Sequence, residues 1–163
     1  MAATANCAEA QVVVCAGYDG GMSRKIQVIA HRGAHERAAE NTLAAYRAAI
    51  ELGCDYIETD VRTTVEGRLV IKHGALKPED VLPDFDEVLR LAKGRIRVYV
   101  DVKQAMPAAI IAAVEQAGMR ESIVTYGGFQ LLADMVKLRP GWPVMPEAVN
   151  AEMLERSLRE LKP

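Results

Sequence analysis

Residues 95–128 read RIRVYVDVKQAMPAAIIAAVEQAGMRESIVTYGG, and this stretch decides the fold class. Its first part, residues 95–103, is rich in Val and Ile, which favour β-strands. Pro107 is typical of the first turn of a helix, and Gly118 is typical of a helix end. Residues 122–128 again have the pattern of a strand that ends in a turn. Strands that alternate with helices lie parallel in one sheet, so the stretch predicts an α/β fold.

The same alternation continues on both sides of this unit. We expect further strands over 26–30, 55–61, 68–73 and 142–149, and helices from Asn41 or Thr42 to Leu52, from Pro83–Asp84 to Lys93, over 129–138 and over 151–161. The chain therefore predicts a mostly parallel sheet of about six strands.

One connection is too short for a parallel sheet. Between Asp60 and Arg68 the chain has only the seven residues VRTTVEG, whereas a parallel crossover needs roughly a dozen or more. Either the two strands pair through a turn at Glu66–Gly67, or a barrel is distorted here. A closed eight-stranded barrel usually takes at least about 200 residues, so a barrel built from this chain would be incomplete.

Composition indicates one soluble globular domain. The chain has 163 residues, of which 50% are hydrophobic and 26% are charged. Its formal net charge of −2 gives no electrostatic reason to expect nucleic acid or an anionic membrane surface as a partner. The sequence contains no apolar run of about 18 residues, so no transmembrane segment is expected.

The N-terminal segment is small and apolar and lacks the basic start of a secretory signal. We expect a poorly ordered tail over 1–24, followed by the domain over 25–163. The three cysteines, Cys7, Cys15 and Cys54, form no metal-binding motif. The missing signal and the odd cysteine count favour a cytoplasmic location, with export as the alternative.

Ionisable residues gather at the ends of four predicted strands: His31 and Arg32, Glu58 and Asp60, His73, and Asp101 and Lys103. Folds of the α/β class place their active sites at this edge of the sheet. Residues i and i+2 of a strand point to one face, so the Glu–Asp pair shares a face and the Asp–Lys pair repeats the arrangement. Three converging carboxylates would make a site suited to Mg²⁺ or Ca²⁺.

The remaining strand-end residues complete this chemistry. Two histidines can divide the roles of general base and general acid, because imidazole titrates near neutral pH. Arg32 and Lys103 would bind an anion. A cation, two histidines and two basic residues at one edge suit hydrolysis of a phosphate ester. Taken alone, each residue has a structural alternative: a carboxylate on a solvated edge, a capped or core histidine, or a basic residue in a salt bridge.

The segment 29–73, IAHRGAHERAAENTLAAYRAAIELGCDYIETDVRTTVEGRLVIKH, contains the elements H-R-G, E-N-T, E-x-D-V and V-x-x-H. In this order and spacing they resemble the glycerophosphodiester phosphodiesterase family, and VYVDVK (98–103) is similar to the family's next strand, which usually reads E-x-K. The resemblance implies a distorted TIM-type (β/α) barrel, here incomplete. It also implies metal-dependent hydrolysis of glycerophosphodiesters to sn-glycerol 3-phosphate and an alcohol.

The resemblance assigns a role to each site residue. The roles are acid/base catalysis for His31 and His73, metal binding for Glu58, Asp60 and Asp101, phosphate binding for Arg32 and Lys103, and support for Glu40, which would orient Arg32 or approach the metal. The cofactor would be a divalent cation, Mg²⁺ or Ca²⁺, and the partner a small-molecule phosphodiester substrate.

Four features depart from the family pattern. Asp101 stands where the family usually has Glu, and Gly74 follows His73 where it usually has Asp. Residues 74–84 replace a small inserted subdomain, and the chain stops near where the seventh and eighth strands would begin. Three explanations stay open: a fragment, a chain that pairs with a second copy as a homo-oligomer, or a partly stable protein. The alternative functions are a non-catalytic module and a phosphodiesterase acting on another phosphodiester or a lysophospholipid.

Overall fold

The computed structural model describes residues 15–16 and 26–163 of the chain. In chain order the elements are β1 (Cys15–Ala16), β2 (Ile26–Gln27), β3 (Ile29–Ala30), α1 (Leu43–Glu51), β4 (Tyr56–Thr63), β5 (Leu69–Ile71), α2 (Phe85–Ala92), β6 (Arg97–Gln104), α3 (Pro107–Ala117), the short 3₁₀ helix η1 (Arg120–Ser122), β7 (Ile123–Gly127), α4 (Phe129–Leu138), β8 (Val144–Pro146) and α5 (Ala151–Glu160).

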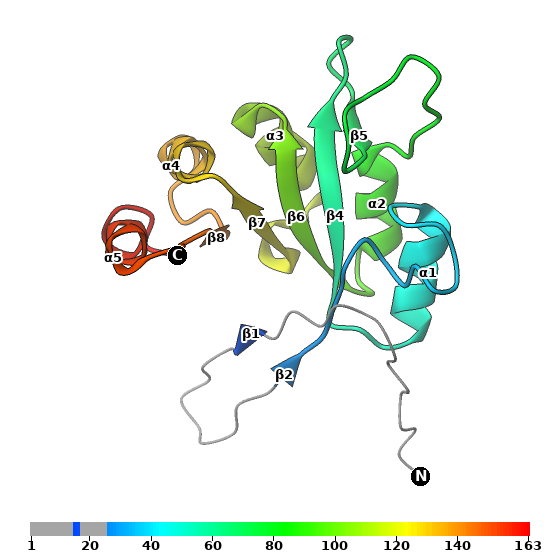
Figure 1. Ribbon diagram of the computed structural model, residues 1–163, viewed down its shortest axis with the longest axis horizontal. Helices are drawn as coiled ribbons and strands as arrows, with labels where there is room; N and C mark the ends of the chain where they lie inside the picture. Colours follow the sequence, from blue (N-terminus) through cyan, green and yellow to red (C-terminus); the bar gives the residue numbers. More distant parts are fainter. Residues whose placement is uncertain (1–14, 17–25) are drawn as a thin grey trace.

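Six strands form the main sheet. Their order is β3-β4-β6-β7-β8, and β5 pairs with β4 (Figure 1). All neighbours are parallel except β5, which is antiparallel to β4. Within the described residues no pairing joins β3 to β8, so the sheet is open. The predicted α/β fold with six strands and an incomplete barrel is confirmed.

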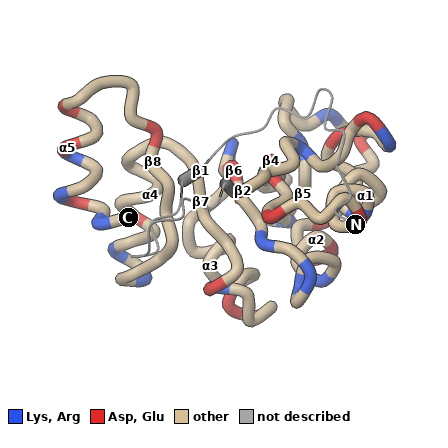
Figure 2. Tube along the Cα trace, turned by 90° about the horizontal axis from the view of Figure 1, so that it is seen from below, with Lys and Arg blue, Asp and Glu red and all other residues tan. Residues whose placement is uncertain are grey.

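The sheet has two unlike faces. Alternate strand residues such as Ile57, Val61, Val98 and Val100 are buried in one hydrophobic cluster with side chains of the helices. Figure 2 shows α4, α3, α2 and α1 following one another along one side of the strands. The intervening residues of β4 and β6 point to the opposite face. That face carries the polar side chains of the candidate site.

Local sequence signals explain the ends of the elements. Helix α3 begins at Pro107 and is capped by Gly118 after its last residue, Ala117; the φ of 65° at Gly118 is left-handed and suits a residue without a side chain. Helix α1 is capped by Thr42, whose side chain accepts a hydrogen bond from the Ala45 N–H at 3.2 Å. Of the two predicted caps, Thr42 is therefore the one used.

The short link between β4 and β5 is a hairpin, which confirms the first of the two predicted alternatives. The Thr64 N–H donates to the carbonyl of Arg68 at 2.8 Å, and Gly67 takes a φ of 86° in the turn. Strand β5 ends at Ile71, earlier than predicted. His73 therefore lies in the turn after the strand and outside the ladder.

Most of the predicted tail over 1–24, including Cys7, lies outside the described residues. Within it, Cys15–Ala16 form β1, which pairs antiparallel with β2. Cys54 packs against the hydrophobic core. None of the helices in the described part of the chain is long and apolar enough to cross a membrane.

Candidate active site

Three acidic side chains meet on the face of the sheet away from the helices. Glu58 and Asp60 lie on β4, and Asp101 lies on β6 as the register partner of Asp60. One carboxylate oxygen of each lies within 4.8 Å of the others. Glu58 and Asp60 are only 5% and 1% exposed. The structure therefore brings together the three predicted carboxylates.

Two basic side chains reach into this carboxylate cluster. Lys103 Nζ donates to Asp101 Oδ2 at 2.7 Å and lies 3.3 Å from Asp60 Oδ1. Arg32 Nε lies 3.2 Å from Asp60 Oδ2, while Arg32 Nη1 donates to Glu40 Oε2 at 3.0 Å. Of the two alternatives predicted for Glu40, the structure shows the contact that orients Arg32.

The surrounding acids keep both basic groups charged. Burial lowers the pKa of Lys103, but the hydrogen bond to Asp101 and the charge of Asp60 outweigh it, so the net pKa is raised. Burial likewise opposes the charge of Arg32, and contacts with Glu40 and Asp60 raise its pKa overall. An anionic group bound here would meet two fixed positive charges.

The excess of negative charge is clearest at Glu58. Burial, and then repulsion from Asp60, raises the pKa of Glu58 to about 8, although the Arg32 backbone N–H donates to its Oε2 at 2.8 Å. Asp60 Oδ1 is buried and, beyond its ion-pair contact with Lys103, accepts no hydrogen bond from the described residues. A divalent cation would relieve both conditions. Carboxylate oxygens are the ligands that Mg²⁺ and Ca²⁺ take, so these residues fit such an ion.

The turns that carry the two predicted histidines approach the same part of β4. Strand β3 pairs with the first two residues of β4, and β5 pairs with the last three. Residues 58–60 are left without a strand on that side, as far as the described chain extends. His31 follows β3 directly, and Lys72, just before His73, donates its N–H to the carbonyl of Asp60 at 2.9 Å. The two turns therefore reach the carboxylates from the two ends of this gap.

The histidines have different surroundings. His31 is half-buried, and burial followed by the charge of Arg32 lowers its pKa, which favours the neutral imidazole. His73 is exposed. His35 is also exposed, as predicted for a loop residue, and its Nδ1 lies 3.1 Å from the His31 carbonyl oxygen.

Sequence reasoning missed a buried polar network behind the carboxylates. Asn41 Nδ2 donates to Asp60 Oδ2 at 2.8 Å, and Asn41 Oδ1 accepts from the Tyr46 hydroxyl at 2.9 Å. The Tyr46 hydroxyl also shares a hydrogen bond with the Thr59 hydroxyl at 2.8 Å. The sequence pattern predicts no role for Asn41 beyond that of a helix cap. The available signal was its place between Glu40 and Thr42 in the E-N-T element.

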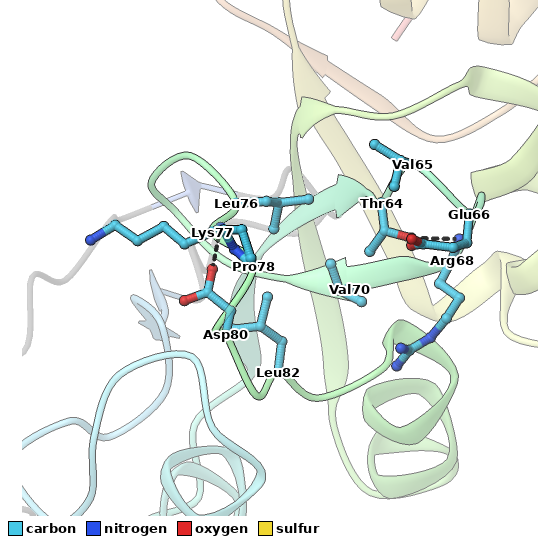
Figure 3. A pocket seen from close by; sticks show the side chains of 10 residues that line it. All are labelled: Thr64, Val65, Glu66, Arg68, Val70, Leu76, Lys77, Pro78, Asp80 and Leu82. Carbon is cyan, nitrogen blue, oxygen red and sulfur yellow. Dashed lines mark hydrogen bonds between the residues drawn. The ribbon is translucent and has the colours of Figure 1, made fainter.

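A pocket of about 520 Å³ is lined by other residues than those predicted for the site. It lies between the β4–β5 hairpin and the segment that leads to α2, and Figure 3 shows Val70, Leu76 and Leu82 among its apolar side chains. The Lys77 N–H donates to Asp80 Oδ2 at 2.7 Å beside it. Its size alone does not make it the reactive site, because the converging charges lie at the carboxylate cluster.

Known sequences are similar to this chain. Residues 31–137 match a family model described as the glycerophosphoryl diester phosphodiesterase family. A glycerophosphodiester phosphodiesterase of Caldanaerobacter subterraneus is 53% identical over 49 residues, which are 30% of this chain and 20% of that protein. YqiK of Bacillus subtilis is 30% identical over 119 residues, 64% of this chain and 49% of that protein. The chain thus spans about half or less of the length of these relatives.

Solved structures share the fold. A glycerophosphodiester phosphodiesterase from Agrobacterium tumefaciens superposes with a TM-score of 0.67 at 26% identity, covering 73% of this chain and 65% of that one. A phosphodiesterase from Oleispira antarctica, solved in complex with the product sn-glycerol-3-phosphate, gives a TM-score of 0.66 at 20% identity, covering 83% and 72%. The fold of this chain therefore matches the larger part of each of these two solved chains.

Proposed function

Because the chain belongs to the glycerophosphoryl diester phosphodiesterase family, we propose that it hydrolyses a glycerophosphodiester to sn-glycerol 3-phosphate and an alcohol with a divalent cation. One observation carries the proposal: three carboxylates, two cationic side chains and two histidine-bearing turns converge on residues 58–60 of β4. A purely structural cluster would gain nothing from placing a third acid beside two buried ones, because like charges at a buried site repel.

The carboxylates would hold the cation. Glu58, Asp60 and Asp101 supply oxygen ligands from two neighbouring strands, and Mg²⁺ or Ca²⁺ suits them. When bound, such an ion polarises a phosphoryl oxygen and offsets the negative charge that builds in the transition state.

The two basic residues would bind the phosphate. Arg32 is held by Glu40 on its outer side and faces Asp60 with its Nε. Lys103 stands on the other side of Asp60, where it also contacts Asp101. A phosphate between them would be fixed by a planar guanidinium and a point charge, and both charges would stabilise its developing charge.

The histidines would move the protons. One imidazole takes the proton from the attacking oxygen as the new P–O bond forms. The other gives a proton to the leaving alkoxide as the old P–O bond breaks. The attacking oxygen is that of water or of the glycerol's own hydroxyl; in the second case water opens the cyclic product afterwards. The turns that carry His31 and His73 approach β4 from different ends of the gap, which suits attack and departure on opposite sides of the phosphorus.

The test is release of glycerol 3-phosphate from glycerophosphocholine with Mg²⁺, with Ca²⁺ and with EDTA. We expect cation-dependent release that falls roughly 100-fold or more in His31→Ala and in His73→Ala. The matched control is His35→Asn, because Asn keeps a donor near the position of Nδ1 at an exposed site. Sedimentation of the active protein shows whether it works as a monomer or as a homo-oligomer.

A negative result would be informative if the protein is folded and a thermal shift shows that it binds the cation. No release from glycerophosphocholine, with release from lysophosphatidylcholine or another diester, would change the substrate. No release from any diester would leave a non-catalytic module with a metal site.

A further inference from the structure

We propose that Arg62 is a positioning residue that fixes the turn carrying His73. The inference rests on the proposed function, because it matters for catalysis only if His73 transfers a proton. Arg62 lies on β4 two residues after Asp60, at the point where the register between β4 and β6 shifts and Arg62 comes to lie opposite Gln104. Its guanidinium donates to backbone carbonyls of the turn after β5 and to the side chain of Gln104.

The hydrogen bonds of Arg62 all go to protein oxygens. Nη2 donates to the His73 carbonyl at 2.7 Å, and Nε donates to the carbonyls of Lys72 at 3.1 Å and His73 at 3.3 Å. Nη1 donates to Gln104 Oε1 at the end of β6 at 3.3 Å. One side chain therefore ties the turn after β5 to two strands of the sheet. A flat, always-charged group with several fixed donors suits this task.

The turn needs such a tie because few other contacts within the described residues hold His73, although an ion pair with Asp80 holds the neighbouring Lys72. Strand β5 ends at Ile71, and the last backbone bond toward β4 is the one from Lys72. Gly74 has no side chain, and the space beside it is open within 4 Å of where a Cβ would stand. His73 itself is exposed. The position of its imidazole therefore depends on its backbone, and Arg62 holds the carbonyl of that backbone.

These contacts separate Arg62 from the phosphate-binding pair. Arg32 and Lys103 are paired with carboxylates of the cluster, so a phosphate and a cation bound there would exchange partners with them. Arg62 is engaged with neutral carbonyl and amide oxygens and not with the carboxylates that would take the cation. Loss of Arg62 should therefore lower kcat by misplacing His73 and should leave the binding of the phosphate unchanged.

The experiment compares Arg62→Met and Arg62→Lys with the matched control Arg68→Met. Arg68 stands on the same hairpin, exposed, and pairs with Asp84. Steady-state kinetics should show a fall in kcat of roughly 10- to 100-fold in Arg62→Met with KM nearly unchanged. Arg62→Lys should recover part of kcat, because one ammonium can still donate to the His73 carbonyl. Arg68→Met should behave like wild type.

A second measurement needs no turnover. The 163-residue chain labelled at the histidine ring carbon Cε1 has three histidine signals, which single His→Asn variants assign. In Arg62→Met only the His73 signal should move and sharpen toward that of a free histidine. An unmoved His73 signal would overturn the proposal even if wild type proved inactive. A raised KM with unchanged kcat would also overturn it, and would make Arg62 a substrate contact.

Discussion

Glu58→Gln replaces a buried ionisable side chain with a neutral one of the same size, and it keeps an oxygen for the Arg32 N–H. The pKa of Glu58 is about 8 in the folded protein, against an ordinary value of 4.5. Between these pH values the folded state holds a proton that the unfolded state releases, so rising pH removes stability. The cost is about 1.4 kcal/mol per pH unit and reaches about 3 kcal/mol at pH 7. In the absence of cation, Glu58→Gln should therefore be more stable than wild type by about 3 kcal/mol, or roughly 6–12 °C.

The assay is thermal and urea unfolding in EDTA at pH values from 5 to 8. The advantage of Glu58→Gln should be small at pH 5 and should grow up to pH 8. Glu51→Gln is the matched control, because Glu51 is an exposed residue of α1, and it should differ from wild type by less than about 0.5 kcal/mol. Adding Mg²⁺ or Ca²⁺ should stabilise wild type more than Glu58→Gln, since the variant lacks one of the three carboxylates.

Two results would refute this reasoning. If Glu58→Gln is less stable than wild type at pH 7 without cation, the carboxylate is not strained by its neighbours in the folded state. If the difference between the two proteins stays constant from pH 5 to pH 8, the effect comes from packing and not from charge.

Three further substitutions near the site have expected effects on stability or activity. Asn41→Ala removes the amide that donates to buried Asp60, so the free energy of unfolding should fall by roughly 1–3 kcal/mol in urea denaturation; an unchanged midpoint would mean that water replaces the amide. Gly33→Ala would place a Cβ 2.8 Å from the backbone carbon of Ala45 at a φ of 84°, and the same assay should show a loss of roughly 1–3 kcal/mol; wild-type stability would contradict this. Lys103→Met removes a positive charge that would compete with a metal ion for the carboxylates of Asp60 and Asp101. Calorimetry should therefore show Mg²⁺ binding no weaker than in wild type, while the rate of hydrolysis falls roughly 100-fold or more. Weaker Mg²⁺ binding would instead show that Lys103 holds the carboxylates in place for the ion.

Local sequence signals such as proline, glycine and helix caps predict the helices and most strands, because each signal depends only on residues close together in the chain. Helix α4 has the predicted ends, and α3 begins and ends at the predicted proline and glycine. The strand predicted over 26–30 is instead divided at Val28. There the N–H donates to Asp55 Oδ2 at 2.9 Å, a contact between residues far apart in sequence that no local pattern reports.

The sequence predicts which residues of one strand share a face, but not which residues of neighbouring strands lie opposite one another. Period-two alternation placed Glu58 and Asp60 on one face, and the structure agrees. The pairing of Asp60 with Asp101 is a property of the β4–β6 ladder and could not be read from either strand alone. The role of Arg62 could not be predicted for the same reason, because its partners lie in a turn whose path depends on where β5 ends.

The short β4–β5 link is what makes room for this site. A parallel neighbour running the full length of β4 would have filled the edge at residues 58–60 with a ladder of backbone bonds. Because β5 returns antiparallel and stops at Ile71, that edge is left to turns on both sides. One turn gives the Arg32 N–H to Glu58, and the other gives the Lys72 N–H to the carbonyl of Asp60. The same gap in pairing thus orients a carboxylate and brings both histidine-bearing turns to it. We therefore expect changes in the length of the hairpin to damage activity more than changes in its exposed turn residues.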